Sequence, residues 1–293
     1  MSTTILKALL GVLLLTGIAS AMAAERGWQR PFSEVAGLSA RAPDRVVDYG
    51  PAASQFVELW LPAEPDSASP VVVLIHGGCW LADYDIAHIR PLAAALADAG
   101  FAVWAPEYRR VGEAGGGWPG TFKDIATAVD ALANYDEVPL DRSRIVFTGH
   151  SAGGHLALWA AARERLPRDS VLHTETPLQP RGVLGLSAIT DLAAYARGDT
   201  SCERVTQTFM GGSPDALPGR YAQASPTALG ATTDTVLLQG GADAIVSPAQ
   251  AEALAGARVV MLPDAGHFDL VHPQTPAFGR ILTLLEDLVT DAP

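Results

Sequence analysis

The sequence is poor in basic residues and in cysteine. Its 293 residues include 20 Lys and Arg against 32 Asp and Glu, which gives a formal net charge of −12 at pH 7. Nucleic acids and anionic membranes bind positive surfaces, so this balance disfavours both as partners. Glycine (28) and proline (21) occur at ordinary levels, and the sequence contains no internal repeat or linker. These features favour one globular domain.

Motifs for metal and phosphate binding are also missing. The sequence contains no H-E-x-x-H, and His150 and His155 do not have the spacing of a metal-ligand pair. The glycine-rich stretch at 112–120 lacks the G-K-[ST] of a phosphate-binding loop. Neither kind of site is expected.

The N-terminus has the layout of a secretory signal peptide, predicted over residues 1–23. Lys7 precedes an apolar run that is too short for a convincing membrane span, and small residues follow it. Cleavage after Ala23 would leave residues 24–293 as a single domain in the periplasm or the medium. An uncleaved membrane anchor is the alternative.

The only two cysteines are Cys79 and Cys202. In an oxidising compartment such a pair can form a disulfide, and two buried free thiols are the alternative. The sequence alone does not choose between them, because it gives no separation of the two Cα atoms.

Strand and helix patterns alternate along the chain. The predicted strands cover 55–62, 71–78, 101–108, 144–147, 182–189, 235–241 and 258–264. The predicted helices cover 89–100, 121–137, 152–165, a short stretch after Pro248, and 275–291, and Thr121 with Asp124 would form a capping box. Mostly continuous apolar strands alternating with helices predict an α/β fold with a mostly parallel sheet covered on both faces.

Two segments are less regular. Residues 24–54 are predicted to be an irregular arm. For residues 190–234 a small cap or lid and a plain crossover loop with a helix both stay open.

The stretch GHSAG at 149–153 matches G-x-S-x-G, with a strand before it and a helix after it. That context predicts a sharp turn that presents Ser151 as a nucleophile near a helix N-terminus, with small neighbours for steric reasons. A serine hydroxyl needs a base. His267, in a loop between the last strand and the last helix, is the predicted base, rather than His173 or His272.

The acid that orients the base is expected at the end of a strand between Ser151 and His267. Asp243 follows the strand at 235–241 and is the predicted residue. Asp191 is its main competitor, Asp264 lies only three residues from His267, and Asp234 precedes the strand.

The stretch HGGCW at 76–80 directly follows a buried strand. Backbone N–H groups of such a loop can hold the oxyanion of acyl transfer. Gly78 and Cys79 are the predicted donors, with Gly77 close by and Ala152 as the donor after the nucleophile. Two tryptophans, Trp80 and Trp118, either line a substrate pocket or are ordinary core and surface aromatics.

HGGCW together with GHSAGG resembles the α/β-hydrolase superfamily, in particular its esterase and kynurenine-formamidase-like branch, whose members carry H-G-G-x-W. The resemblance covers residues 55–290. It implies an eight-stranded, mostly parallel sheet whose second strand is antiparallel, with no metal or organic cofactor. Cys79 stands where members of this branch often have glycine or tyrosine.

The predicted function is a serine hydrolase that cleaves small-molecule carboxylic esters through an acyl-enzyme intermediate. An arylformamidase-type amide hydrolase is the alternative, which the secretory signal argues against. A peptidase would need a propeller or a large cap. A non-catalytic binding module on the same fold typically loses the serine or the histidine, whereas this chain retains Ser151, Asp243 and His267.

Overall fold

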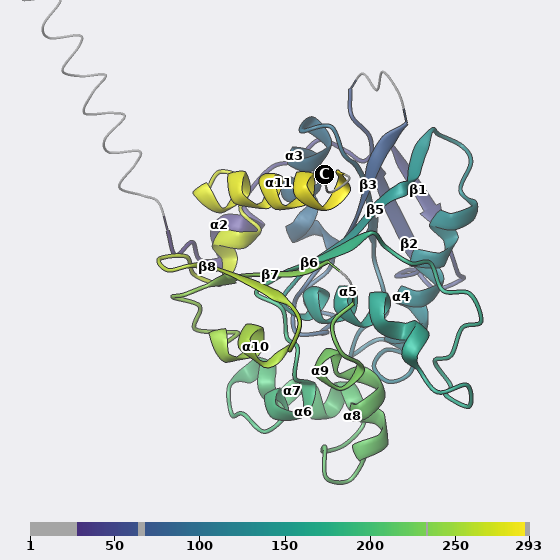
Figure 1. Cartoon of the computed structure of the whole chain (residues 1–293), viewed down its shortest axis with the longest axis vertical. Coiled ribbons are helices and arrows are strands. Elements are labelled where there is room, and N and C mark those ends of the chain that lie inside the picture. The colour runs from purple at the N-terminus through teal and green to yellow at the C-terminus, as the bar shows by residue number, and fades with distance from the viewer. Residues whose placement is uncertain (1–27, 64–67, 233, 291–293) are drawn as a thin grey trace, which may run out of the picture.

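Eight strands form one twisted sheet in the computed structural model, which describes residues 28–63, 68–232 and 234–290 (Figure 1). The predicted signal peptide lies outside the described residues. The sheet order is β1-β2-β4-β3-β5-β6-β7-β8. The strands are β1 (Arg45–Asp48), β2 (Phe56–Trp60), β3 (Ser69–Ile75), β4 (Ala102–Pro106), β5 (Leu140–His150), β6 (Gly182–Leu186), β7 (Thr235–Gly240) and β8 (Arg258–Leu262).

The sheet is mostly parallel, as predicted. Strand β2 is antiparallel to both of its neighbours, β1 and β4, and all other neighbouring pairs are parallel. The implied antiparallel second strand is therefore confirmed. Parallel order places the carboxyl ends of β3, β5, β7 and β8 at one edge of the sheet, where the candidate site residues follow them.

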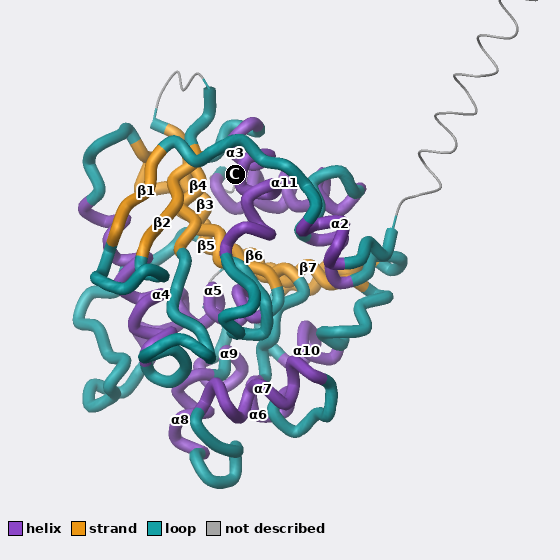
Figure 2. Tube along the Cα trace, turned by 180° about the vertical axis from the view of Figure 1, so that it is seen from behind, coloured by secondary structure: helices purple, strands orange, loops and turns teal. Residues whose placement is uncertain are grey.

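Helices cover both faces of the sheet. They include α3 (Arg90–Asp98), α4 (Gly120–Ala131), α5 (Ala152–Ala162), α10 (Pro248–Ala253) and α11 (Pro276–Val289). Figures 1 and 2 show α3 and α11 on one side of the sheet and α4 and α5 on the other. Along β3, Val71, Val73 and Ile75 belong to the core under α4 and α5, and Val72 and Leu74 belong to the opposite core. Both faces of a central strand are thus buried, which explains its continuous apolar run.

The predicted irregular arm contains two elements that the sequence pattern missed. These are helix α2 (Phe32–Ala36) and the edge strand β1. Strand β1 has only four residues, three of them exposed, so it lacks the apolar run that identifies the buried strands.

The predicted capping box of α4 is wrong. Thr121 is the second residue of the helix, and its hydroxyl donates a hydrogen bond to the Arg109 carbonyl at 2.5 Å. The Asp124 carboxylate is buried and pairs with the Arg109 guanidinium at 2.7 Å. Leaving a buried carboxylate without a charged partner costs more free energy than leaving the start of a helix without this cap. The ion pair with Arg109 therefore takes the Asp124 carboxylate away from the capping position.

Residues 190–232 contain several helices rather than a plain crossover loop with a helix. These are α6 (Leu192–Tyr195), α7 (Ser201–Met210), α8 (Pro218–Ala224) and α9 (Pro226–Leu229), which gather at one end of the molecule (Figure 1). We refer to residues 191–229 as the cap segment. Within the described ranges, no helix combines the length and the apolar character that crossing a membrane would require.

Candidate active site

Ser151 occupies the turn between β5 and α5. Its backbone angles are φ 56° and ψ −120°, in a region that costs a non-glycine residue about 1–3 kcal/mol. The Ser151 N–H donates to the Leu186 carbonyl at 2.9 Å, and Ser151 itself is almost fully buried. The structure therefore contains the sharp strand-to-helix turn that the motif predicts.

The glycines around Ser151 are required by close approach of the backbone. A Cβ atom on Gly153 would overlap the carbonyl oxygen of Ile75 at the end of β3. A Cβ atom on Gly154 would lie 2.6 Å from the Ala188 Cβ. Only glycine lets α5 start this close to the neighbouring strand ends, which is why small residues surround the serine.

His267 and Asp243 are brought together from separate loops. Asp243 follows β7, and His267 begins a short 3-10 helix (His267–Leu270) after β8. The Nδ1 atom of His267 lies 2.7 Å from an Asp243 carboxylate oxygen, and both side chains are buried. The other Asp243 oxygen accepts the N–H groups of Ile245 and Val246, each at 2.8 Å.

This environment keeps Asp243 ionised. Burial acts to raise its pKa, but the hydrogen bond from His267, the charge that this ring carries when protonated, and the Val246 N–H outweigh burial and lower it. An ionised Asp243 accepts the His267 Nδ1–H and leaves Nε2 of that ring free to take a proton.

Ser151 and His267 line one pocket of about 180 Å³. The other described residues that line it are Phe32, Gly78, Cys79, Tyr84, His88, His150, Ser201, Cys202, Ile245 and Phe268. An apolar cavity of about 150 Å³ holds a benzene molecule, so this pocket has room for a group of roughly that size.

The loop after β3 runs beside the serine. A Cβ atom on Gly77 would lie 3.3 Å from the Ser151 Cβ and 2.7 Å from the His150 carbonyl oxygen. Gly78 and Cys79 have positive φ angles of 101° and 53°. Among the described residues, the N–H groups of Gly78, Cys79 and Ala152 have no hydrogen-bond acceptor. These are the three predicted oxyanion donors, and Gly77 provides the close approach.

A buried ionic network holds the start of this loop. His76 contacts Glu107 at 2.8 Å, and its ring stacks on Tyr108 with 4.4 Å between ring centroids. The Tyr108 hydroxyl donates to the His76 carbonyl at 2.8 Å. Burial acts to raise the pKa of Glu107, but the charges of His76 and Arg110 outweigh it and lower that pKa. His76 begins the HGGCW motif, but no sequence pattern indicated Glu107, Tyr108 or Arg110 as its partners.

His150, the residue before the serine, also supports His267. Its Nε2 donates to the His267 carbonyl at 3.0 Å, and the two ring centroids are 4.3 Å apart. Burial and the nearby charge of His267 hold the pKa of His150 well below its usual range. A neutral His150 adds no positive charge beside the ring that must accept a proton.

The N-terminal arm reaches the same pocket. Phe32 of α2 contacts the rings of Tyr84 and Phe268, each with 5.4 Å between centroids. The Asp269 carboxylate accepts the N–H groups of Gln29 (2.5 Å) and Arg30 (3.1 Å) as well as that of Gly266 (2.7 Å), which ties the arm to the His267 loop. No motif in the arm identified Phe32, whereas Phe268 could have been suspected from its place beside His267.

The competing acids and bases do not line the pocket. Asp191 caps α6 by accepting the Ala194 N–H at 2.9 Å, and His272 accepts the Gln274 N–H at 3.2 Å. His173, Asp234 and Asp264 do not appear among the residues around Ser151 either.

The two tryptophans lie elsewhere, contrary to the pocket interpretation. Trp80 is fully buried and stacks on Phe209 with 4.6 Å between centroids. Trp118 packs against Phe122 at 5.4 Å, and the Arg220 guanidinium lies 5.9 Å from its ring centroid. Both are packing residues.

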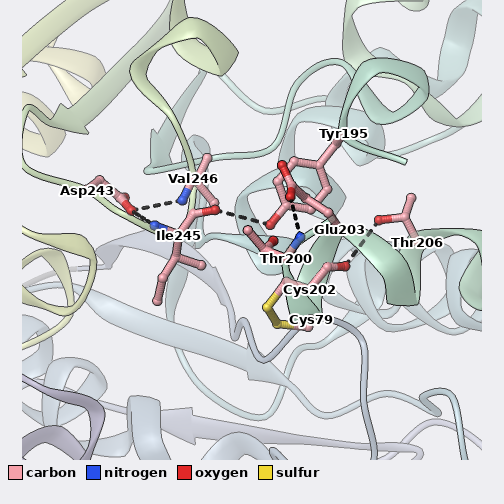
Figure 3. Close-up of a disulfide and its surroundings, with 9 residues drawn as sticks. All are labelled: Cys79, Tyr195, Thr200, Cys202, Glu203, Thr206, Asp243, Ile245 and Val246. Carbon is pink, nitrogen blue, oxygen red and sulfur yellow. Dashed lines mark hydrogen bonds between the residues drawn. A yellow bond between two sulfur atoms is a disulfide. The ribbon is translucent and has the colours of Figure 1, made fainter. Parts of the chain in front are cut away.

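Cys79 and Cys202 form a disulfide with 5.2 Å between their Cα atoms (Figure 3). The question that the sequence leaves open is therefore answered in favour of the bridge. Within the described part of the chain, no group of three or more His, Cys, Asp or Glu side chains could hold a metal ion.

Comparison with known proteins places the chain in a family. The model of the BD-FAE family matches residues 57–257, which is more than half of the 293 residues. The chain belongs to the BD-FAE family. The matched range contains Ser151, Asp243 and the loop after β3, and it ends ten residues before His267.

Curated relatives of this BD-FAE family member resemble only part of it. Esterase LipC of Mycobacterium tuberculosis is 30% identical over 126 residues, covering 42% of this chain and 31% of LipC. The isoprenylcysteine alpha-carbonyl methylesterase ICME of Arabidopsis thaliana is 30% identical over 151 residues, covering 49% and 33%. The chain thus spans about a third of the length of these relatives.

Solved structures share the fold over most of the chain. A truncated carbohydrate esterase from gut microbiota has a TM-score of 0.71 at 22% identity, covering 86% of this chain and all of that one. An inhibited esterase B from Lactobacillus rhamnosis has a TM-score of 0.71 at 21% identity, covering 95% and 96%. These similarities show that the BD-FAE chain has the α/β-hydrolase fold. They do not single out the kynurenine-formamidase-like branch.

Proposed function

We propose that this protein is a serine hydrolase that cleaves carboxylic esters of small molecules. The observation that carries the proposal is the meeting of three predicted residues at one edge of the sheet. Ser151 stands on a strained turn and lines a pocket with His267, and His267 is paired with Asp243 at 2.7 Å. Membership of the BD-FAE family and the esterases among the similar proteins support the same activity.

The reaction proceeds by acylation and deacylation. Ser151 Oγ attacks the ester carbonyl carbon while His267 Nε2 takes the hydroxyl proton, and Asp243 stabilises the imidazolium that forms. His267 then gives the proton to the departing alcohol. A water molecule, deprotonated in turn by His267, attacks the acyl-enzyme, and the carboxylic acid leaves as Ser151 regains its proton.

The oxyanion is held by main-chain donors. The N–H groups of Gly78, Cys79 and Ala152 have no acceptor among the described residues, so they are available to the negative oxygen. Ala152 begins α5, where the helix dipole also favours negative charge. Each such donor contributes about 10²–10³-fold to kcat in enzymes of this kind.

The pocket favours a short acyl group. Its volume of about 180 Å³ and its aromatic wall of Phe32, Tyr84 and Phe268 leave space for roughly six carbon atoms. Acetate to hexanoate esters are therefore the proposed substrates, and longer chains must extend out of the pocket.

The test is hydrolysis of p-nitrophenyl esters from acetate to decanoate, together with an N-formyl amide. Ser151→Ala is expected to lower kcat by about a thousandfold or more. Ser143→Ala is the matched control, because Ser143 is an exposed serine of β5 that does not line the pocket, and its loss should change kcat by less than about threefold. Equal rates for the wild type and Ser151→Ala would refute the proposal. A clear preference for the formyl amide would replace the ester with an amide.

We also propose a periplasmic or extracellular location. The Cys79–Cys202 disulfide supports it, since such bonds persist in oxidising compartments. Sequencing the N-terminus of the protein recovered from cells tests it, with Ala24 expected as the first residue.

A further inference from the structure

Helix α7 of the cap segment is in direct contact with the loop that carries the proposed oxyanion donors. Cys79 is bonded to Cys202, and the neighbouring Trp80 stacks on Phe209 with an interplanar angle of 10°. Cys202 and Phe209 are seven residues apart on α7, which is about two helical turns, so they share one face of the helix. One face of α7 thus meets two successive residues of the loop.

These two loop residues have an unfavourable backbone conformation. Cys79 and Trp80 have φ angles of 53° and 57°, in the left-handed region that non-glycine residues avoid. Such conformations persist only where the surroundings impose them. Trp80 is fully buried, and its carbonyl accepts the Val111 N–H at 2.8 Å. Cys79 is only half-buried, and its side chain is fixed by the covalent bond to α7.

The cap segment also touches the loop of the proposed acid. The Tyr195 hydroxyl of α6 donates to the Ile245 carbonyl at 3.4 Å, and the Ile245 N–H donates to Asp243 (Figure 3). The cap segment therefore contacts both the loop that carries the proposed oxyanion donors and the loop that carries Asp243.

We propose that the Cys79–Cys202 disulfide positions the oxyanion donors, so that breaking it lowers the rate of acyl transfer in the folded protein. Cys202 is then a positioning residue that acts through Cys79. The inference rests on the proposed function. The reason is geometric: oxyanion donors work only at hydrogen-bond distance from the developing charge, and losing one costs about 10²–10³-fold. Partial misplacement of the Cys79 N–H should cost at least about tenfold.

The bond is open to chemical reduction. Both cysteines are half-buried and line the pocket, so a small dithiol can reach them. Dithiothreitol cleaves the S–S bond to two cysteine thiols and becomes its own cyclic disulfide, a transfer of two electrons and two protons.

The experiment compares Cys202→Ser with the wild type and with a control in the same helix. Glu203→Ala is that control, because the Glu203 carboxylate accepts the Thr200 N–H at 2.8 Å and stabilises the start of α7 without touching Cys79. Two rates are measured well below the unfolding temperature: ester hydrolysis, and phosphonylation of Ser151 by a p-nitrophenyl alkylphosphonate. Phosphonylation needs the nucleophile and the oxyanion donors but no turnover.

We expect kcat and the phosphonylation rate of Cys202→Ser to fall together by at least about tenfold, with KM changed by less than about threefold. The double variant Cys79→Ser/Cys202→Ser should match it, which rules out an effect of the free Cys79 thiol. Glu203→Ala should keep both rates while losing thermal stability. If Cys202→Ser does not fold, wild type reduced with dithiothreitol, with an unchanged circular dichroism spectrum, gives the same comparison.

Wild-type rates in Cys202→Ser, with only a lower unfolding temperature, would overturn the inference and leave the bond a purely stabilising role. If the wild type hydrolyses no ester but is phosphonylated at Ser151, the proposed function fails, and the phosphonylation rates of the variants still decide this inference. If Ser151 is not phosphonylated at all, both the proposed function and this inference are refuted.

Discussion

Acidification should destabilise the protein through His155, a buried histidine of α5. Its ring lies among Trp80, Phe122 and Phe209, and its Nε2 donates to the Ala224 carbonyl at 2.9 Å. Burial lowers the pKa of His155 to about 4, and the hydrogen bond to Ala224 only partly opposes this. The imidazole is therefore neutral in the folded protein near neutral pH.

The sign and the size of the effect follow from proton binding. In the unfolded chain the pKa of His155 is near 6.5, so below that pH the unfolded state binds more protons than the folded state. The contribution of His155 to the free energy of unfolding is fully present above pH 6.5 and is lost as the pH falls toward 4. At pH 5 the unfolded imidazole is almost fully protonated and the folded one about one-tenth protonated. The loss between pH 7 and pH 5 is therefore about 2 kcal/mol.

The assay is urea unfolding of the wild type and His155→Gln at pH 5, 6, 7 and 8. Glutamine does not titrate and can still donate to the Ala224 carbonyl, so the variant should lose about 2 kcal/mol less than the wild type between pH 7 and pH 5. The difference at pH 8, where both forms are neutral, measures the packing cost and serves as the internal control. Buried His88, whose pKa burial also lowers to about 4, contributes equally to both proteins. Parallel pH curves for the two proteins would refute the reasoning.

Three further changes have expected outcomes. Gly153→Ala forces a Cβ atom against the Ile75 carbonyl and should lower the free energy of unfolding by about 2–3 kcal/mol in urea titrations, with loss of ester hydrolysis. Phe32→Ala enlarges the pocket and should move the optimum of the p-nitrophenyl series to longer chains, whereas Phe278→Ala, at a half-buried site on α11, should leave it unchanged. An unchanged optimum in Phe32→Ala would exclude Phe32 as a wall of the acyl site. Asp269→Asn weakens a carboxylate that accepts three N–H groups and should lower the free energy of unfolding by about 2 kcal/mol, measured by urea midpoint.

Local sequence was enough to predict most of the framework of the sheet. Seven strands and the main helices could be predicted from apolar runs and from the turn residues that bound them. Buried parallel strands and amphipathic helices differ in the spacing of their apolar residues. The edge strand β1 was not predicted because an exposed strand of four residues has no such apolar run. The capping box predicted for α4 was wrong because Asp124 forms an ion pair with Arg109, fifteen residues away in the sequence.

The candidate site divides in the same way. Ser151 was predicted because it lies in a motif that is complete within five residues, between a strand and a helix. Asp243 and His267 were predicted because each follows the end of a strand, in the chain order expected after such a serine. The sequence alone thus determined which side chains are presented at the edge of the sheet.

Only the tertiary structure decided what surrounds those residues. The pairing of Cys79 with Cys202 joins positions 123 residues apart, and Phe32 reaches His267's neighbour Phe268 from the opposite end of the chain. Trp80, which stands next to the proposed donors in sequence, packs instead on Phe209 of α7. Such contacts depend on how whole elements pack against one another, and no short pattern of residues encodes that packing.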